Sequence, residues 1–326
     1  MRILDFHNHF YPPEYLDAIR KGPSNVKVTM DEEGNPLLHY PGDYNVAVPG
    51  HRDIDFRSEV LRKTGVEMQL ITLTTPGTHI ETPSRAAELA RITNDAFARI
   101  VLERPRQYAS LATLPLNDPK ASIAELERAF SLGFRGAMLF SNVNGESLAS
   151  EKFWPLYELA SDRKAVLYIH PTSPVGVEAM TDFWLMPLVG FTFDTTLAAA
   201  KLVFSGVLKR FPDIRWALTH MGGAIPYLSE RLDRGYEAFS ECRASIDQLP
   251  SYYLRQMYYD TVNFNPAAIR FAIGFAGVDH ILAGSDYPHL IGSIEKMKSS
   301  IDALRLSEVD RGKILGGNAR RLLGVS

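Results

Sequence analysis

The sequence predicts an α/β protein built as a single (β/α)8 TIM barrel, with a small antiparallel β insertion after the first strand. Short apolar strand patterns alternate with helical patterns, eight such strands can be counted, and 326 residues suit one barrel. Length alone allows either one large domain or two smaller ones. The count of eight strands, each followed by a helix, favours one domain over residues 1–326 and a barrel over a doubly wound sheet.

The first strand begins at Ile3 and runs into His7 and His9. The segment that follows, residues 22–50, is rich in Gly, Pro, Asn and Asp and shows only weak strand patterns. Its residues 31–35 (DEEGN) predict a hairpin turn. Because this segment is too short for a core of its own, we interpret it as an inserted β subdomain.

Regular alternation starts at Asp53. Gly65 is a typical C-terminal residue for the first helix, and Asp118-Pro119 is a typical start for a later one. The predicted strands after the first are residues 66–72, 108–114, 136–140, 165–170, 214–220, 257–260 and 280–284. The predicted helices are residues 53–64, 84–103, 119–131, 153–162, 195–210, 231–239 and 266–275.

The composition excludes several classes of partner. The 35 basic and 38 acidic residues are interspersed, so no basic patch is expected for nucleic acid or an anionic membrane. There is no secretory signal pattern, and no uninterrupted apolar run approaches the roughly 18 residues that span a bilayer. Cys242 is the only cysteine, which excludes an intramolecular disulfide and fits a reducing, cytoplasmic compartment.

Histidines gather where the predicted strands end. His7 and His9 are two residues apart on one strand, so their side chains point to the same side. His170 and His220 end the fifth and sixth strands, and Asp286 follows the eighth. The C-terminal ends of barrel strands carry the chemistry. Imidazoles with a carboxylate suit one catalytic divalent ion, most simply Zn²⁺, with Mn²⁺ as the alternative.

Each of these residues alone has an ordinary structural explanation. A single strand-end histidine more often makes a structural hydrogen bond, and Asp before Tyr-Pro is often a turn residue. Their coincidence at one end of one predicted barrel favours a site. His289 follows Asp286 closely enough to line the pocket, with turn packing as the alternative. The remaining histidines need no special role: His39, His51, His79 and His280.

The end of the fourth strand predicts one metal rather than two. Two-metal hydrolases on this fold commonly bridge their ions with a carbamylated lysine there, whereas residues 138–142 of this chain are MLFSN. With one metal, His170 serves as the third imidazole ligand. His220 is then free to act as acid and base.

Several motifs resemble those of the amidohydrolase superfamily, over essentially the whole chain. The branch that they resemble most is that of the aminocarboxymuconate semialdehyde decarboxylases, which includes non-oxidative hydroxybenzoate decarboxylases. The motifs are residues 7–12 (HNHFYP), 194–196 (DTT), 219–223 (THMGG), 259–261 (YDT) and 284–288 (GSDYP), with Arg231 in a helix between the third and the fourth.

The resemblance implies specific roles. Trp184 matches a pocket aromatic, with core packing as the alternative. Arg231 matches an arginine that reaches the neighbouring subunit's site, which implies a homodimer or higher homo-oligomer; its alternative is a weak surface ion pair. The implied ligands of one divalent ion are His7, His9, His170 and Asp286, with His220 as the catalytic acid and base.

The insertion departs from the semialdehyde decarboxylase pattern. That enzyme has a basic pair near residues 42–45 to hold its second carboxylate, and this chain has PGDYN at 41–45. His51 and Arg52 are basic but out of register. This favours a smaller monocarboxylate of the salicylate type.

The expected function is therefore metal-dependent decarboxylation without an organic cofactor. His220, or Asp286 through water, would protonate the ring carbon that bears the carboxylate, and carbon dioxide would leave. The main alternative is a metal-dependent hydrolase of a small ester, lactone or amide. A metal-binding but inactive sensing subunit is the alternative from another class.

Overall fold

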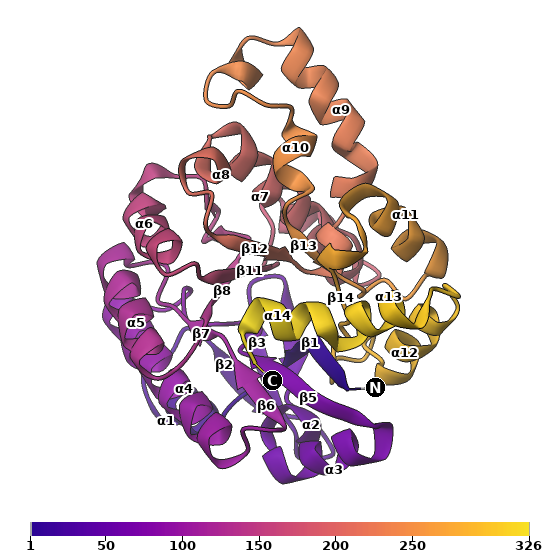
Figure 1. Ribbon diagram of the computed structural model, residues 1–326. Coiled ribbons are helices and arrows are strands. Elements are labelled where there is room, and N and C mark those ends of the chain that lie inside the picture. Colours follow the sequence, from indigo (N-terminus) through magenta and orange to yellow (C-terminus); the bar gives the residue numbers. More distant parts are fainter. Residues whose placement is uncertain (1, 326) are drawn as a thin grey trace.

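The computed structural model describes residues 2–325 and shows a mixed α/β fold with parallel sheets, as predicted. Helices lie around the outside of the strands (Figure 1). One parallel sheet has the order β1-β5-β6, and the other the order β14-β13-β12-β11-β8-β7. Their strands are β1 (Ile3–His9), β5 (Val66–Thr72), β6 (Tyr108–Ser110), β7 (Ala112–Thr113), β8 (Gly136–Phe140), β11 (Val166–His170), β12 (Arg215–Leu218), β13 (Tyr258–Asp260) and β14 (Ile281–Leu282).

Main-chain contacts connect the two sheets. The predicted strand 108–114 is divided at Leu111, so that β6 pairs with β5 while β7 pairs with β8. On the other side, Phe6 N donates to Ala283 O (2.7 Å) and Asp286 N donates to His7 O (2.8 Å). The segment that follows β14 is therefore held directly against β1.

The helices confirm several local signals. Asp53 caps α3 by accepting from two backbone N–H groups, and Gly65 ends that helix at φ 72°. Asp118 caps α5 in the same way. The α-helices are α1 (Pro13–Lys21), α2 (Pro49–Arg52), α3 (Ile54–Thr64), α4 (Pro83–Glu103), α5 (Pro119–Ser131), α6 (Trp154–Asp162), α7 (Phe191–Phe204), α8 (Val207–Arg210), α9 (Ile225–Ala238), α10 (Pro250–Leu254), α11 (Pro266–Ala276), α12 (Ile294–Asp302), α13 (Glu308–Gly312) and α14 (Asn318–Leu323).

Other helices differ from the prediction. Helix α1 was not predicted, although Pro13 at its first position and buried Tyr15 and Ile19 four residues apart are helical signals. The predicted helix 195–210 begins earlier and is divided at Gly206, which has φ 82°. Helix α9 begins at Ile225, six residues before the predicted start. The last two differences lie at element boundaries, whereas α1 was missed as a whole element.

The insertion forms an antiparallel sheet in the order β2-β3-β4, made of β2 (Lys27–Met30), β3 (Pro36–Tyr40) and β4 (Asp43–Val46). Asp31 closes the predicted turn by accepting from the backbone of Glu33 and Asn35. The insertion packs on the segment after β11, where Ser173 Oγ donates to Pro41 O (2.6 Å).

One helical run, Met186–Phe204, has the length and apolar composition of a membrane-crossing helix. Half of it is buried inside the fold, as in the core helix of a globular protein. It also carries Asp194 and Lys201. Its buried residues Ala198, Ala199, Leu202 and Val203 belong to the hydrophobic core of the fold.

Candidate functional site

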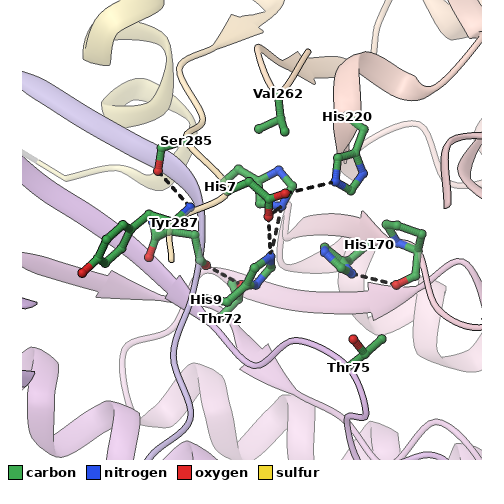
Figure 2. A network of polar contacts seen from close by, with 12 residues as sticks. His7, His9, Thr72, Thr75, His170, His220, Val262, Ser285 and Tyr287 are labelled. Atoms are coloured by element: carbon green, nitrogen blue, oxygen red, sulfur yellow. Dashed lines mark hydrogen bonds and ion pairs between the residues drawn. The ribbon is translucent and has the colours of Figure 1, made fainter. Parts of the chain in front are cut away.

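Two histidines of β1 point into one space at the carboxyl end of the strand (Figure 2). His7 and His9 are fully buried, and their Nε2 atoms lie 3.1 Å apart. The alternation of side chains along a strand accounts for their common direction. Two ring nitrogens this close require either a proton or a cation between them.

Asp286 closes the same space from the segment after β14. Its Oδ1 lies 3.3 Å from Nε2 of both His7 and His9 and accepts no hydrogen bond from the described residues. The Asp286 backbone is left-handed, with φ 57°. Such a conformation is uncommon for residues other than glycine and concentrates at functional sites.

His170 and His220 complete the cluster from β11 and from the turn after β12. The His170 ring centroid lies 4.6 Å from that of His9, and its Nδ1 lies 2.7 Å from Pro171 O. Donation from Nδ1 to that carbonyl leaves Nε2 as a lone-pair donor toward the cluster. His220 Nε2 lies 3.7 Å from Asp286 Oδ2.

These five residues form two overlapping groups whose ligand atoms lie within 4.8 Å of one another: His7, His9 and Asp286, and His7, His170 and His220. Nitrogen and carboxylate donors at these separations fit one divalent ion of the zinc or manganese type. The structure thus brings together all five residues that the sequence singled out. The geometry does not separate His220 from the ligands, so its role as acid and base stays a prediction.

Asp260 at the end of β13 lies in the YDT motif but was assigned no role in the site from the sequence. Its Oδ2 accepts from His7 Nδ1 (2.6 Å), Tyr168 OH (3.0 Å) and His220 N (3.1 Å). A carboxylate that orients a ligating histidine in this way fixes its tautomer and raises its basicity. Its place at the end of the seventh predicted strand was the signal that could have identified it.

The buried charges set distinct protonation preferences. Burial disfavours a charged imidazole, but the carboxylates of Asp260 and Asp286 outweigh it and raise the pKa of His7 to about 10. Burial lowers the pKa of His9 to about 3. Burial tends to raise the pKa of Asp286, but His7 and His220 hold it well below the usual range. A divalent ion binds neutral imidazoles and ionised carboxylates, and its charge would replace the proton favoured on His7.

The end of β8, where two-metal enzymes have their lysine, has a structural role in this chain. Ser141 Oγ and Asn142 Nδ2 both donate to the Asp194 carboxylate, the latter at 2.8 Å. Asp194 is the first residue of the DTT motif and lies on α7. Its hydrogen bonds to Ser141 and Asn142 therefore connect α7 to the end of β8.

The three predicted substrate contacts have different surroundings. The His289 ring lies 5.0 Å from that of His9, so the structure places it beside the cluster. Trp184 is 54% exposed, and its ring contacts Tyr44 of the insertion at 5.5 Å. Arg231 is exposed on α9, and no contact in the described part of the chain joins it to the cluster.

His51, which was also assigned no role from the sequence, lies near the site. It is buried, and neither ring nitrogen has a hydrogen-bond partner among residues 2–325. Its ring lies 4.9 Å from His289 and 5.3 Å from Tyr11. Buried polar atoms without partners are rare and call for a ligand or water, so His51 belongs to the candidate substrate space.

Comparison with known proteins agrees with this geometry. The chain is 30% identical to a 2-amino-3-carboxymuconate-6-semialdehyde decarboxylase of Dictyostelium discoideum, over 99% of this chain and 91% of that protein. It is 29% identical to a 6-methylsalicylic acid decarboxylase of Penicillium expansum, over 99% and 96%. A solved dihydroxybenzoic acid decarboxylase from Polaromonas sp. JS666, with bound manganese and the inhibitor 2-nitroresorcinol, superposes with a TM-score of 0.81 at 26% identity, covering 99% of this chain and 97% of that one.

The sequence profile of the amidohydrolase family matches residues 4–325. The match covers every strand that contributes to the cluster. This chain therefore belongs to the amidohydrolase family.

Proposed function

We propose that this protein is a metal-dependent, non-oxidative decarboxylase of a small aromatic carboxylic acid of the hydroxybenzoate type, which works without an organic cofactor. The observation that carries the proposal is the convergence of His7, His9, His170, His220 and Asp286 in a chain whose full-length relatives are decarboxylases. The 6-methylsalicylic acid decarboxylase supports a salicylate-type substrate.

In this proposal His7, His9, His170 and Asp286 hold one divalent ion. Zn²⁺ is the first choice for these donors, and Mn²⁺, which the Polaromonas structure holds, is the alternative. When bound, the ion supplies a Lewis acid that orients the substrate carboxylate and its neighbouring hydroxyl and offsets their charge.

His220 supplies the proton in the proposed reaction. Its side chain is 11% exposed, whereas those of His7 and His9 are fully enclosed, so it can exchange protons with solvent. The proton goes to the ring carbon that bears the carboxylate. The bond from that carbon to the carboxylate then breaks, its electron pair restores the aromatic ring, and carbon dioxide leaves. Asp286, through water, is the alternative proton donor.

We further propose that His289 lines the substrate space beside His9, and that Trp184 with Tyr44 forms its outer edge. The ring contacts support both placements. The insertion, residues 22–50, then contributes one wall of the entrance.

The test is product analysis. Protein loaded with Zn²⁺ or Mn²⁺ is incubated with salicylate, 6-methylsalicylate and 2,6-dihydroxybenzoate, and separately with aryl esters and lactones. Carbon dioxide should be released from at least one hydroxybenzoate and not after removal of metal with a chelator. Acid release from esters or lactones without any carbon dioxide would instead make the protein a hydrolase.

We also propose that the two sheets close into one (β/α)8 barrel within a single domain. The hydrogen bonds from β1 to residues 283–287 support closure, as does the divided strand β6/β7 on the other side. The proposed assembly is a homodimer, supported by large apolar side chains exposed near Arg231 and after β11: Phe183, Trp184, Phe193, Leu197 and Tyr227. The proposed compartment is the cytoplasm, which the single free cysteine supports.

A further inference from the structure

Arg57 on α3 has the largest of the fully buried side chains among the described residues. A buried charge is costly unless it is well paired, and no carboxylate contacts this guanidinium directly within residues 2–325. Neutral oxygen atoms surround it instead. The arrangement of those acceptors shows what the cation holds.

Four acceptors receive the Arg57 donors. Nη2 donates to His9 O, and Nη1 donates to Asn8 Oδ1 (2.7 Å) and to Gln69 Oε1 (3.1 Å). Nε donates to Gly50 O (2.9 Å). Asn8 lies between the two histidines of β1, so Arg57 hydrogen-bonds both the backbone and the middle residue of the His-x-His segment.

The guanidinium also lies over two aromatic rings. Arg57 Cζ lies 5.4 Å from the centroid of Phe10 and 5.0 Å from that of Tyr287. Phe10 directly follows His9, and Tyr287 directly follows Asp286. One planar cation is thus in contact with the neighbours of two proposed ligands that are far apart in the sequence.

A buried polar chain makes the same connection by a second route. Gln69 Nε2 donates to Asp5 Oδ2 (2.8 Å), and Asp5 accepts from Ser285 N (3.0 Å) and Ser285 Oγ (2.6 Å). Asp5 lies two residues before His7, and Ser285 directly precedes Asp286. These hydrogen bonds connect Arg57, through Gln69 and Asp5, to the turn that carries the Asp286 carboxylate.

We propose that Arg57 is a positioning residue for the metal site, which holds two ligand segments, the end of β1 with His7 and His9 and the turn with Asp286, at the separation that one divalent ion needs. It contacts no side-chain atom of the proposed ligands, so it acts through their backbone and their neighbours. The inference rests on the metal site proposed above. The inference goes further than that proposal, because it assigns the preorganised geometry of the metal ligands to Arg57, a residue outside the site.

The experiment compares Mn²⁺ affinity, measured by competition with a chelator, and melting temperature with and without Mn²⁺. Two variants change Arg57: Arg57→Met removes the charge and its donors, and Arg57→Lys keeps the charge. A third, Gln69→Met, breaks the hydrogen-bonded connection from Arg57 through Gln69 to Asp5. The matched control is Arg104→Met. Arg104 also anchors α3, through Ser58 Oγ (2.8 Å), but contacts neither ligand segment.

Arg57→Met should weaken Mn²⁺ binding by about 10- to 100-fold, the usual effect of removing an outer partner of a metal ligand. The rise in melting temperature caused by Mn²⁺ should shrink with it. Arg57→Lys should recover only part of the affinity, because an ammonium group has three donors and lacks the planar fork that serves the four acceptors of Arg57. Gln69→Met should be intermediate, and Arg104→Met should leave the affinity unchanged.

If Arg57→Met binds Mn²⁺ with wild-type affinity and its melting temperature falls equally with and without Mn²⁺, Arg57 has only a structural role and the inference is overturned. An equal loss of affinity in Arg104→Met would also overturn the inference, because it would trace the effect to a loosened α3. Should Arg57→Met fail to fold, Arg57→Lys and Gln69→Met decide by the same criteria. Absence of metal binding by the wild-type protein would contradict the proposed function itself, whereas wild-type binding that survives in all these variants contradicts this inference alone.

Discussion

His220 is the residue through which the proposed chemistry can be tested most directly. His220→Asn keeps a hydrogen-bonding group but cannot transfer a proton near neutral pH. We expect kcat to fall by about 10²- to 10⁴-fold, with metal content unchanged because the proposed ligands remain. Carbon dioxide release and bound metal per chain are measured together.

The matched control is His280→Asn, which changes a histidine that bonds Arg255 O (2.6 Å) away from the cluster. It should keep full activity. Full activity in His220→Asn would refute the proton-transfer role. Loss of the metal from His220→Asn would show that His220 is a ligand, as its grouping with His7 and His170 allows.

His79 gives a pH-dependent prediction. Burial lowers its pKa to about 4, and its Nδ1 has no partner among the described residues. In the unfolded chain a histidine has a pKa near 6.5, so between these values the unfolded state binds more protons. Stability from the neutral, buried ring is therefore fully present above pH 6.5 and is lost as the pH falls towards 4.

Relative to His79→Gln, the wild-type protein should lose about 2 kcal/mol of unfolding free energy between pH 7 and pH 5, from the two pKa values. Urea denaturation of both proteins at the two pH values measures this difference. An equal pH dependence in both proteins would show that His79 is not held neutral by burial.

The pairing of strands β8 and β11 depends on a missing side chain. A Cβ atom on Gly136 would lie 1.8 Å from Val166 O, the backbone of its partner strand. Gly136→Ala must therefore push the strands apart, and we expect unfolding free energy to fall by about 2–4 kcal/mol. Chemical denaturation provides the measurement.

Gly274 in α11 is the control, because a Cβ atom there would meet nothing within 4 Å. Gly274→Ala should raise stability by about 0.5–1 kcal/mol, since alanine restricts the unfolded chain and favours helix. If Gly136→Ala leaves the free energy of unfolding unchanged, β8 and β11 are not packed as closely as described.

Elements were predicted best where a local signal defines them. The caps of α3 and α5 come from Asp53 and Asp118, whose side chains bond the next turn of their own helix. Such contacts span three residues and are therefore visible in the sequence. The start of α9 and the division of α7 from α8 were not predicted, although Pro226 in the first turn of α9 and the left-handed Gly206 (φ 82°) are local signals for them.

At the scale of the whole molecule, the proposed homodimer makes a prediction about shared sites. Arg231 is exposed, and its neighbour on α9, Tyr227, is 79% exposed. If Arg231 acts in the partner's site, Arg231→Ala and His220→Asn each inactivate a homodimer. In a heterodimer of the two, one site has both residues intact.

Mixing the two inactive variants and allowing subunit exchange should restore about one quarter of wild-type activity, because random pairing gives half heterodimers with one intact site each. Sedimentation velocity establishes the assembly, and carbon dioxide release measures the recovery. A monomeric wild-type protein, or a dimer without recovery, would contradict the contribution of Arg231 in trans.

The sequence by itself determined the alternation of the main parallel strands with helices such as α3, α4 and α5, and the residues that stand at the strand ends. Periodicity, helix caps and the His-x-His spacing are local, so they can be read without a structure. The convergence of His7, His9, His170, His220 and Asp286 followed once parallel strands were predicted, because the carboxyl ends of such strands meet.

Only the tertiary structure decided which groups support that cluster. Asp260 reaches His7 across 253 residues, and Arg57 contacts both ligand segments from a helix that carries no ligand. His51 lies beside His289, whereas Trp184 lies against Tyr44 of the insertion. These contacts depend on how distant segments pack, and no spacing along the chain encodes which buried polar group will satisfy another.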